Sequence, residues 1–409
     1  MRQTLEVLVS TGTRHTFSAP GPERGIVAAR NHLLRELGEI ARQSESRGGP
    51  PLQVELEPFK LSSPEAPQLG EIETANVLAT LPGCEESSRA QKVYFVAHYD
   101  SRAGEEMDPV SDAPGANDNG AAVAMLVEVA RVLAPRCLPS TVVFLFTTGE
   151  EQGLYGAQHH AQRAKQEAAR IVAIINSDMV GDPVLPGGQR NAEEIRVFSE
   201  GFTSDPSSLR ARREWGTEQD SPSRRLAWLV RDIAQQERLE LRPQLIPRPD
   251  RIMRGGDHLA FNESGYAAVR LTQPSEHYER QHANVELREG VQYGDLLQHV
   301  DFEYLTRVTR LNVALAEHLA SMPLEPQAVR LVMRRPGHEM LVRWQPSAHA
   351  DRYEVWTRGV SEAEWRSVTP TNGTEARIPH SPDAQVAGIR ACRARYCSPI
   401  ITAAQRADE

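Results

Sequence analysis

The stretch VYFVAHYDS, residues 93–101, consists of five apolar residues that run directly into a histidine and, two positions later, an aspartate. Two later stretches repeat the arrangement, VVFLFTTGEE at residues 142–151 and IVAIINSD at residues 171–178. Short runs that are apolar on both faces are typical of central strands in a parallel sheet covered by helices on both sides. Because ligands bind beyond the carboxyl ends of such strands, we expect all three to deliver polar side chains to one edge.

Helical and strand patterns around these runs complete the fold prediction. Apolar residues recur at helical spacing over five segments, residues 25–44, 120–133, 154–165, 221–239 and 300–320. Residues 52–59, residues 74–81 and a run from Ala267 have the pattern of further strands. We therefore predict an α/β fold over residues 1–323, with a mixed, centrally parallel sheet sandwiched by helices.

The pattern changes after Pro326. Short alternating stretches separated by turns, such as EMLVRWQP at 339–346 and RYEVWTRG at 352–359, indicate a small all-β sandwich over residues 327–409. Trp344 and Tyr353 resemble the core positions of a fibronectin type III module. This segment has no cluster of metal-ligating residue types, so we expect an accessory module that docks to a partner or to the catalytic domain.

Charge and composition exclude several classes of protein. The 409 residues carry 46 basic and 55 acidic side chains, a net charge of −9 that is unsuited to binding phosphate backbones. No segment approaches the roughly 18 apolar residues of a membrane span, and the N-terminus lacks the apolar run of a secretory signal. The four cysteines are too few for a disulfide scaffold. Cys84 could lie near Cys137, and Cys392 could bridge to Cys397 across a hairpin end.

The apolar runs end in residue types that bind metals. His98 and Asp100 follow the first run, Glu150 and Glu151 the second, and Asp178 the third. Between the first two runs, GANDNGAA at 115–122 also places the carboxylate of residue 118 at a helix start, where the helix dipole favours it. Each residue alone has an ordinary explanation, such as an N-cap or a solvated helix start. Together, carboxylates that converge on one crevice repel one another unless a cation is present, so the set predicts a metal site.

These motifs resemble those of the co-catalytic zinc peptidases of the bacterial leucyl aminopeptidase type, a family that also includes glutaminyl cyclases and transferrin-receptor ectodomains. The resemblance covers residues 20–320 and rests on AHYDS, GANDNGA, TGEEQGLYG, NSDMVG and a late histidine. It implies two zinc ions bridged by Asp118. The remaining roles that it implies are His98 and Asp178 as ligands of one ion, Glu151 and the late histidine as ligands of the other, Glu150 as the general base, and Asp100 behind His98 to fix its tautomer.

The segment EHYERQHANVE, residues 276–286, offers two candidates for the late histidine, His277 and His282. In the family, a small hydroxyl residue follows the ligand directly and an acid follows shortly after. His282 with Glu286 fits this frame better, although Ala283 replaces the usual threonine and Glu286 the usual aspartate. We therefore predict His282, with His277 as the alternative.

Two other polar features each have two interpretations. His258 resembles a family element near the site that is not a ligand, but it could equally be a histidine at a helix start that is capped by Asp257. The loop at residues 101–116 carries four acids that could lie near the α-ammonium group of a substrate or could simply be solvated: Glu105, Glu106, Asp108 and Asp112.

The resemblance implies a metal-dependent aminopeptidase that acts on peptides with a free N-terminus. Glutaminyl cyclase-like and carboxypeptidase-like activities are the enzymatic alternatives on the same scaffold. A non-catalytic binding ectodomain is expected to have lost ligands, whereas every motif position is filled here. A C-terminal module on this family favours a secreted or periplasmic enzyme whose leader is absent from this chain, with a cytoplasmic location as the alternative.

Overall fold

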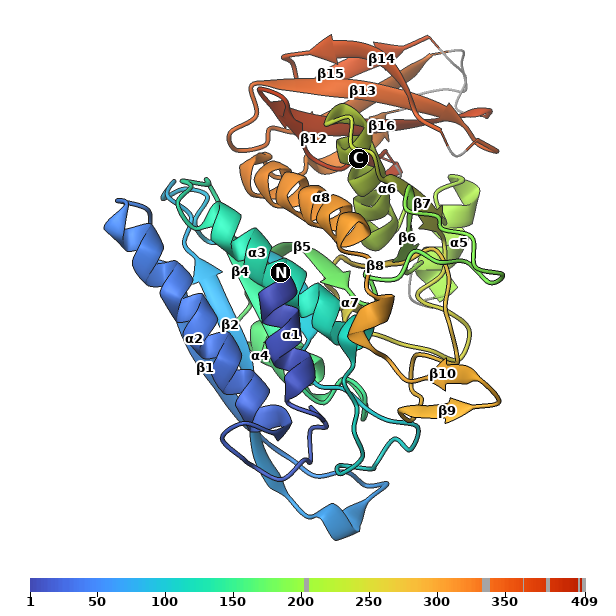
Figure 1. The fold of residues 1–409 in the computed structure, drawn as a ribbon. Coiled ribbons are helices and arrows are strands. Elements are labelled where there is room, and N and C mark those ends of the chain that lie inside the picture. The colour runs from blue at the N-terminus through green and yellow to red at the C-terminus, as the bar shows by residue number, and fades with distance from the viewer. Residues whose placement is uncertain (202–205, 333–338, 363, 380–382, 404, 407–409) are drawn as a thin grey trace. The chain divides into compact units, whose positions relative to one another are not determined.

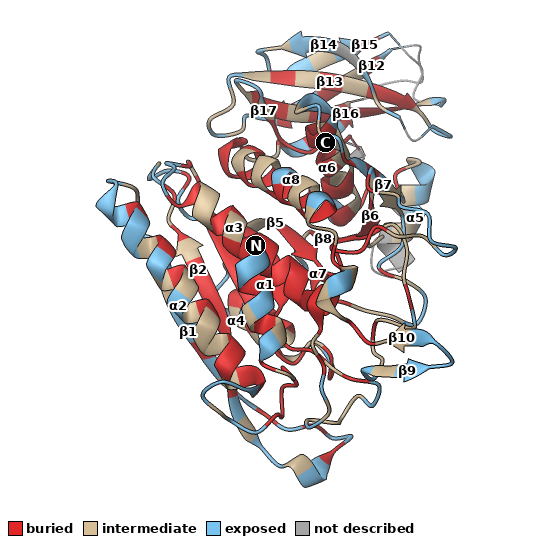
Figure 2. Cartoon of the chain, viewed as in Figure 1, coloured by how far each residue is buried: buried red, intermediate tan, exposed pale blue. Residues whose placement is uncertain are grey.

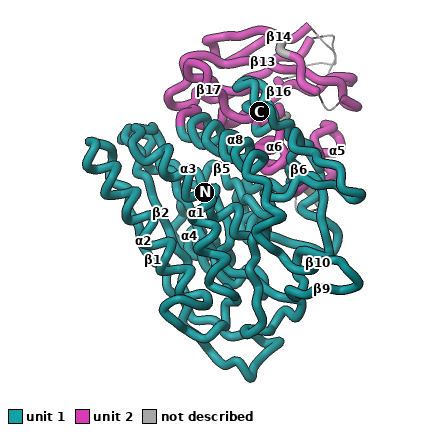
Figure 3. Tube along the Cα trace, in the orientation of Figure 1, with its two compact units in different colours: residues 1–199, 230–320 teal, residues 200–229, 321–409 magenta. Residues whose placement is uncertain are grey.

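The computed structural model describes residues 1–201, 206–332, 339–362, 364–379, 383–403 and 405–406. The chain divides into two compact units, which Figure 3 shows in different colours. Unit 1 comprises residues 1–199 and 230–320, and unit 2 comprises residues 200–229 and 321–409. No sequence pattern separates residues 200–229 from the first predicted domain, yet they group with unit 2.

Unit 1 is built on an eight-stranded sheet with the order β1-β2-β4-β3-β5-β8-β6-β7. The central strands β4, β3, β5 and β8 are parallel to one another, and antiparallel neighbours flank them on both sides. The strands are β1 Gln53–Leu61, β2 Ile72–Leu81, β3 Gln91–His98, β4 Thr141–Thr147, β5 Arg170–Ser177, β6 Glu194–Ser199, β7 Arg242–Ile246 and β8 Ala268–Thr272. This confirms the predicted mixed, centrally parallel sheet.

Helices cover both faces of this sheet (Figure 1). The helices of unit 1 are α1 Arg2–Ser10, α2 Gly25–Ser46, α3 Ala122–Leu133, α4 Tyr155–Gln166, α7 His258–Glu263 and α8 Phe302–Ser321, and α6 Pro222–Gln236 begins in the segment of unit 2 and ends in unit 1. On β3, Tyr94 and Val96 pack in one apolar cluster with residues of α4 and α7. The alternate residues of β3 are also fully buried, and α3 packs against this strand. Figure 2 shows this burial along the central strands.

None of the helices in the described ranges has an apolar stretch long enough to cross a bilayer.

The central strands end in register at one edge of the sheet. His98, the last residue of β3, lies opposite Thr147, the last residue of β4. On the other side of β3, Val96 pairs with Asn176 near the end of β5. The polar residues that follow these strands therefore start from neighbouring positions, as the sequence predicts.

Several elements carry too little sequence signal to be predicted. Strands β6 and β7 contain charged residues, so they lack a continuous apolar run, and of the two only β7 is an outermost strand of the sheet. The hairpin of β9 Glu286–Arg288 and β10 Val291–Tyr293 is short and partly exposed. Helix α1 has only nine residues and no side-chain cap.

Unit 2 contains two sheets with the orders β15-β12-β11-β19 and β14-β13-β16-β17, and β18 pairs with β16. The strands are β11 Gln327–Val332, β12 Met340–Gln345, β13 Arg352–Gly359, β14 Arg366–Thr371, β15 Glu375–Ile378, β16 Gln385–Arg393, β17 Tyr396–Cys397, β18 Ile401–Thr402 and β19 Gln405–Arg406. Residues from both sheets form one core, in which the rings of Trp344 and Tyr353 lie 5.4 Å apart. This confirms a small all-β sandwich, while its likeness to fibronectin type III stays a prediction.

A buried ion pair joins residues 200–229 to the strands of unit 2. The guanidinium of Arg358 on β13 donates to both carboxylate oxygens of Asp220 at 3.0 Å, and Thr402 donates to the same carboxylate at 2.7 Å. Helix α5 Pro206–Glu214 belongs to the same segment. Because buried charges are stable only when they are paired, these contacts explain why the segment groups with the sandwich.

Two disulfides join the cysteines in the pairs that the sequence left open, Cys84 with Cys137 and Cys392 with Cys397. The second disulfide closes the end of the β16–β17 hairpin, where the two cysteines are paired in register.

Candidate metal centre

Three neighbouring strands and one helix start position the predicted site residues. His98 ends β3, Glu150 and Glu151 follow β4 after a short turn, and Asp178 directly follows β5. Asp118 lies in the segment Ala116–Ala121 that leads into α3, at a position where the backbone is not helical (φ −108°, ψ 91°). All of these side chains are buried except that of Glu150, which is 11% exposed.

Five of the predicted residues form two groups that share one carboxylate. The ligand atoms of His98, Asp118 and Asp178 lie within 4.8 Å of one another, and so do those of Asp118, Glu151 and His282. Nε2 of His98 lies 3.3 Å from Oδ1 of Asp118, whereas Nε2 of His282 lies 3.2 Å from Oδ2. The two oxygens of one carboxylate therefore face two different histidines.

Buried atoms without partners indicate that these groups are built for a cation. Nε2 of His98, Oε1 of Glu151 and Oδ1 of Asp178 are buried and have no hydrogen-bond partner among the described residues. Such atoms are costly in a folded protein and call for an unseen ligand. Imidazole nitrogen and carboxylate oxygen together are the donors that Zn²⁺ prefers, so the residues present fit a zinc site.

The backbone carbonyl and the carboxylate of Asp100 both lie near the imidazole of His98. Nδ1 of His98 donates to the backbone oxygen of Asp100 at 3.2 Å, and the Asp100 carboxylate lies 3.6 Å from the same nitrogen. The other carboxylate oxygen of Asp100 accepts from the backbone N–H of Glu151 at 3.1 Å. A proton held on Nδ1 leaves the lone pair of Nε2 for a metal ion.

The pKa values of two carboxyl groups in the site are shifted in opposite directions. Burial alone would raise the pKa of Asp118, but the imidazoles of His282 and His98 hold this pKa well below its ordinary value. Burial raises the pKa of Glu150 well above its ordinary value, and the charge of Asp178 adds to the effect while His98 opposes it. Asp118 therefore stays an anion at neutral pH, and Glu150 is the carboxyl that readily takes up a proton.

Metal affinity is expected to rise with pH because a proton occupies His98 in the metal-free protein. Burial opposes protonation of His98, but Glu150 and the neighbouring aspartates raise its pKa well above the ordinary value. Below that pKa an incoming ion must displace this proton, so the apparent affinity should increase about tenfold per pH unit for each proton released. Competition with a chromophoric zinc chelator at pH 6, 7 and 8 measures how steeply the apparent zinc affinity rises with pH. An affinity independent of pH would contradict the expectation.

The structure brings His282 to the site and leaves His277 outside it. His277 donates through Nε2 to the carbonyl of Val184, 2.7 Å away, and belongs to neither ligand group. Nε2 of His282 lies 2.9 Å from Oε2 of Glu151. Burial opposes protonation of His282, yet Glu151 and Asp118 raise its pKa to about 10. Nη1 of Arg254 lies 2.8 Å from Nδ1 of His282, on the other side of the ring.

Two buried residues that the sequence does not reveal hold the segment around Asp118. The carboxylate of Asp295 accepts from the backbone N–H groups of Asn117 at 2.9 Å and Asp118 at 2.7 Å. Burial raises the pKa of Asp295 to about 7. Arg14 is fully buried and donates to the carbonyl of Gly115 at 2.8 Å. Both residues come from loops without a motif.

Arg270 on β8 compensates the charge of Asp178. Its guanidinium lies 3.1 Å from Asp178 and 3.0 Å from Asp250, and it is fully buried. Although burial opposes it, the charges of these two aspartates raise the pKa of Arg270. The sequence could have predicted the role of Arg270, because a single arginine inside an apolar strand requires a buried carboxylate partner.

The interpretation of Asp257 as the cap of the His258 helix is wrong. Its carboxylate makes no side-chain cap and instead accepts from the hydroxyl of Thr147 at 2.5 Å. Burial raises the pKa of Asp257 to about 7, although the charge of His98 opposes this. His258 is buried at the start of α7 and lies 2.8 Å from the carbonyl of Pro249 through Nε2. It joins neither ligand group.

The site opens into a cavity of about 270 Å³. Of the four acids in the loop at residues 101–116, only Glu106 lines this cavity, and it pairs with Arg102 at 3.2 Å. Asp112 pairs instead with Arg24 at 2.5 Å. Asp108 accepts from backbone N–H groups of its own loop.

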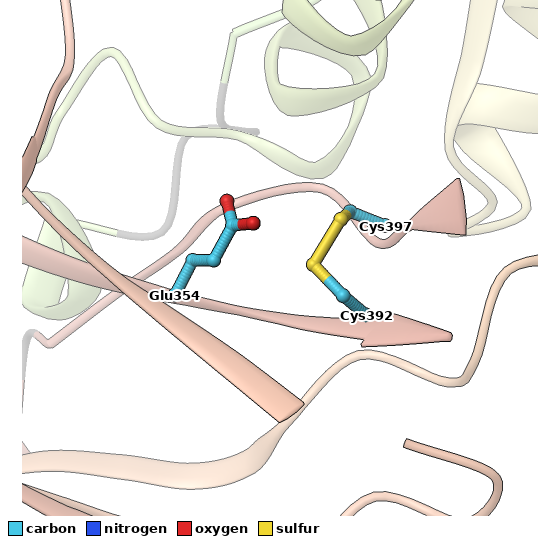
Figure 4. A group of neighbouring side chains, drawn as sticks. All are labelled: Glu354, Cys392 and Cys397. Carbon is cyan, nitrogen blue, oxygen red and sulfur yellow. A yellow bond between two sulfur atoms is a disulfide. The ribbon is translucent and has the colours of Figure 1, made fainter. Parts of the chain in front are cut away.

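A third group of metal-ligating residue types lies in unit 2 (Figure 4). It consists of Glu354 with Cys392 and Cys397, but the two sulfur atoms are joined in a disulfide and are not free to bind an ion. Glu354 pairs with Arg390 at 2.7 Å. The disulfide and the ion pair account for the closeness of these three side chains, so the group is not a candidate metal site.

Solved structures with a similar fold include a peptidase and a cyclase. The Legionella pneumophila LapA aminopeptidase is 20% identical, with 78% of this chain and 70% of that chain covered and a TM-score of 0.53. The Fimbriiglobus ruber glutaminyl cyclase is 17% identical, with 76% and 92% covered and a TM-score of 0.51. These likenesses show the fold alone.

Similarity of sequence extends over nearly the whole chain. A probable zinc metalloprotease of Leptosphaeria maculans is 36% identical over 390 residues, which cover 94% of this chain and 89% of that protein. A probable zinc metalloprotease of Pyrenophora tritici-repentis is 36% identical over 416 residues, with 98% and 94% covered. Residues 76–296 match peptidase family M28, and they include every predicted site residue. The chain therefore belongs to peptidase family M28.

Proposed function

We propose that the chain is a zinc aminopeptidase that removes N-terminal residues from peptides. One observation carries the proposal: the two oxygens of Asp118 face two histidines, each of which belongs to its own group of candidate ligands. A shared carboxylate between two groups is the arrangement that two-metal hydrolases use.

The proposed ligands divide between two ions. Asp118 would bridge them, with His98 and Asp178 at one ion and Glu151 and His282 at the other. The names of the curated relatives, probable zinc metalloproteases, support zinc as the metal. When bound, zinc supplies a Lewis acid that polarises a carbonyl oxygen and lowers the pKa of a bound water.

Glu150 is the proposed general base. It lines the cavity but belongs to neither ligand group, and burial raises its pKa toward the range in which a carboxyl group can both accept and give up a proton. It would accept the proton of the attacking water while the oxygen of that water bonds to the scissile carbonyl carbon. The same proton would then pass to the leaving amine as the carbon–nitrogen bond breaks. The adjacent Glu151 faces His282 and remains an anionic ligand.

An assay of three reactions on one zinc-loaded preparation tests the proposal. We expect release of the N-terminal residue from aminoacyl anilides and from unblocked peptides, and two zinc ions per chain by elemental analysis. Cyclisation of an N-terminal glutamine peptide without hydrolysis would favour a glutaminyl cyclase-like enzyme instead. Release of the C-terminal residue from an N-acetylated peptide would favour a carboxypeptidase-like enzyme.

A further inference from the structure

The cavity beside the proposed metal centre has a cationic lining. Four arginines line it: Arg102, Arg251, Arg254 and Arg270. Three of them pair with carboxylates, Arg102 with Glu106 at 3.2 Å, Arg251 with Asp250 at 2.9 Å and Arg270 with Asp178 at 3.1 Å. Within the part of the chain that the structure describes, Arg254 has no carboxylate at ion-pair distance, and its one side-chain polar contact is to Nδ1 of His282.

This contact occupies only one of the five N–H donors of the Arg254 guanidinium. The other guanidinium N–H groups of Arg254 make no hydrogen bond with any residue that the structure describes. Arg254 lines the cavity, so its guanidinium presents unpaired donors and a positive charge there.

The loop that carries Arg254 is held in place on both sides. The carbonyl of Gly255 accepts from Arg251 at 3.1 Å and from Arg270 at 2.5 Å. Met253 adopts a φ of +59° and is 97% exposed at the cavity rim. A strained backbone conformation of this kind persists where the surrounding contacts enforce it, and it is common at ligand-binding sites.

Each acidic residue that lines the cavity already has a proposed role or an ion-pair partner. Four of the five are proposed metal ligands or the general base, and the fifth is Glu106, which is paired with Arg102. No lining carboxylate in the described ranges is therefore free for a substrate ammonium group. The unpaired charge that remains in the cavity is positive and belongs to Arg254.

We propose that Arg254 binds a carboxylate of the substrate close to the scissile bond and so determines specificity. The inference deepens the proposed function and rests on it. A planar guanidinium binds a carboxylate with two parallel hydrogen bonds, which an amide of the same size cannot replace. The carboxylate can come from the C-terminus of a dipeptide or from an acidic side chain next to the cleaved bond.

Matched pairs of substrates that differ only in one carboxylate test the role of Arg254. The first pair is alanyl-alanine and alanyl-alanine amide, and the second is alanyl-glutamate amide and alanyl-glutamine amide. For wild-type protein we expect kcat/KM to favour the anionic member of one pair by about 10- to 100-fold, the range for hydrogen bonds to a charged group. The pair that shows the preference identifies the source of the carboxylate.

Three variants connect this preference to Arg254. Arg254→Met should reduce the ratio to within about twofold, and Arg254→Lys should keep part of it, because lysine retains the charge but not the planar fork. Arg248→Met is the matched control, since Arg248 is an exposed arginine of the same loop region outside the cavity lining and its loss should leave the ratio unchanged. Equal rates within both pairs for wild-type protein, or a preference that survives Arg254→Met, would overturn the inference.

A binding measurement separates this inference from the proposed function. In a Glu150→Gln background, calorimetry gives the Kd of the intact dipeptides, and we expect the same preference for the anionic member. Absence of hydrolysis by wild-type protein together with this preference would overturn the aminopeptidase and leave the carboxylate site standing. Hydrolysis without any preference in kcat/KM or Kd would overturn the role of Arg254 alone.

Discussion

Replacement of Glu150 by glutamine is expected to lower kcat by about 10²- to 10⁴-fold, the usual contribution of a general acid–base group. Glutamine has nearly the same size and shape as glutamate but cannot take up the proton of the attacking water. Because Glu150 belongs to neither ligand group, the variant should retain its zinc. Steady-state kinetics and elemental analysis of the same preparation measure both quantities.

The neighbouring residue provides the control for this experiment. Glu151 belongs to the group with Asp118 and His282, and its side chain lies 2.9 Å from the histidine. Glu151→Ala should therefore lose metal as well as activity. A Glu150→Gln protein with full activity would remove the proposed base, and one that lost its zinc would place Glu150 among the ligands.

Asp118→Ala is expected to abolish tight zinc binding at both positions and to reduce activity to background. Asp118 is the one residue that both ligand groups share, so its loss takes an anionic oxygen from each. Loss of an outer partner alone costs about 10- to 100-fold in metal affinity, so loss of a direct, shared ligand should cost more at each position. Elemental analysis after dialysis gives the number of ions per chain, and circular dichroism reports whether the fold is retained.

A variant at one group makes the Asp118 experiment specific. His282→Ala should reduce the zinc content by one ion, whereas Asp118→Ala should remove both, because His282 belongs to only one group. Zinc added after exhaustive chelation should restore the activity of the wild-type protein. It should not restore activity in either variant. Full zinc content in Asp118→Ala, or hydrolysis by wild-type protein after confirmed metal loss, would contradict the two-metal centre.

The central part of the fold is readable from the sequence because the central strands of the sheet are apolar on both faces. VYFVA, VVFLF and IVAII become β3, β4 and β5, and the helical patterns between them become α3 and α4. Strands β6 and β7 could not be read in this way, because Glu194 and Arg196 in β6 and Arg242 in β7 interrupt the apolar pattern. The grouping of residues 200–229 with unit 2 depends on Asp220 and Arg358, which are 138 residues apart in sequence.

The candidate site likewise contains residues that the sequence predicts and residues that it does not. His98, Asp178 and the adjacent glutamates follow apolar strands directly, so their meeting at one edge follows from the parallel order of those strands. Arg270 could have been found, because it interrupts an apolar strand. Asp295 has no such signal, since it comes from a loop and acts through the backbone of Asn117 and Asp118.

By itself, the sequence determined the α/β class, the edge at which the chemistry gathers and the residue types that gather there, because strand periodicity and strand ends are local properties. Only the tertiary structure decided that His282 and not His277 reaches Asp118, that Asp257 bonds to Thr147 instead of capping a helix, and that Arg254 faces the cavity without a carboxylate. These outcomes depend on loops whose paths are set by contacts between segments far apart in the chain. No local pattern of residues encodes such contacts.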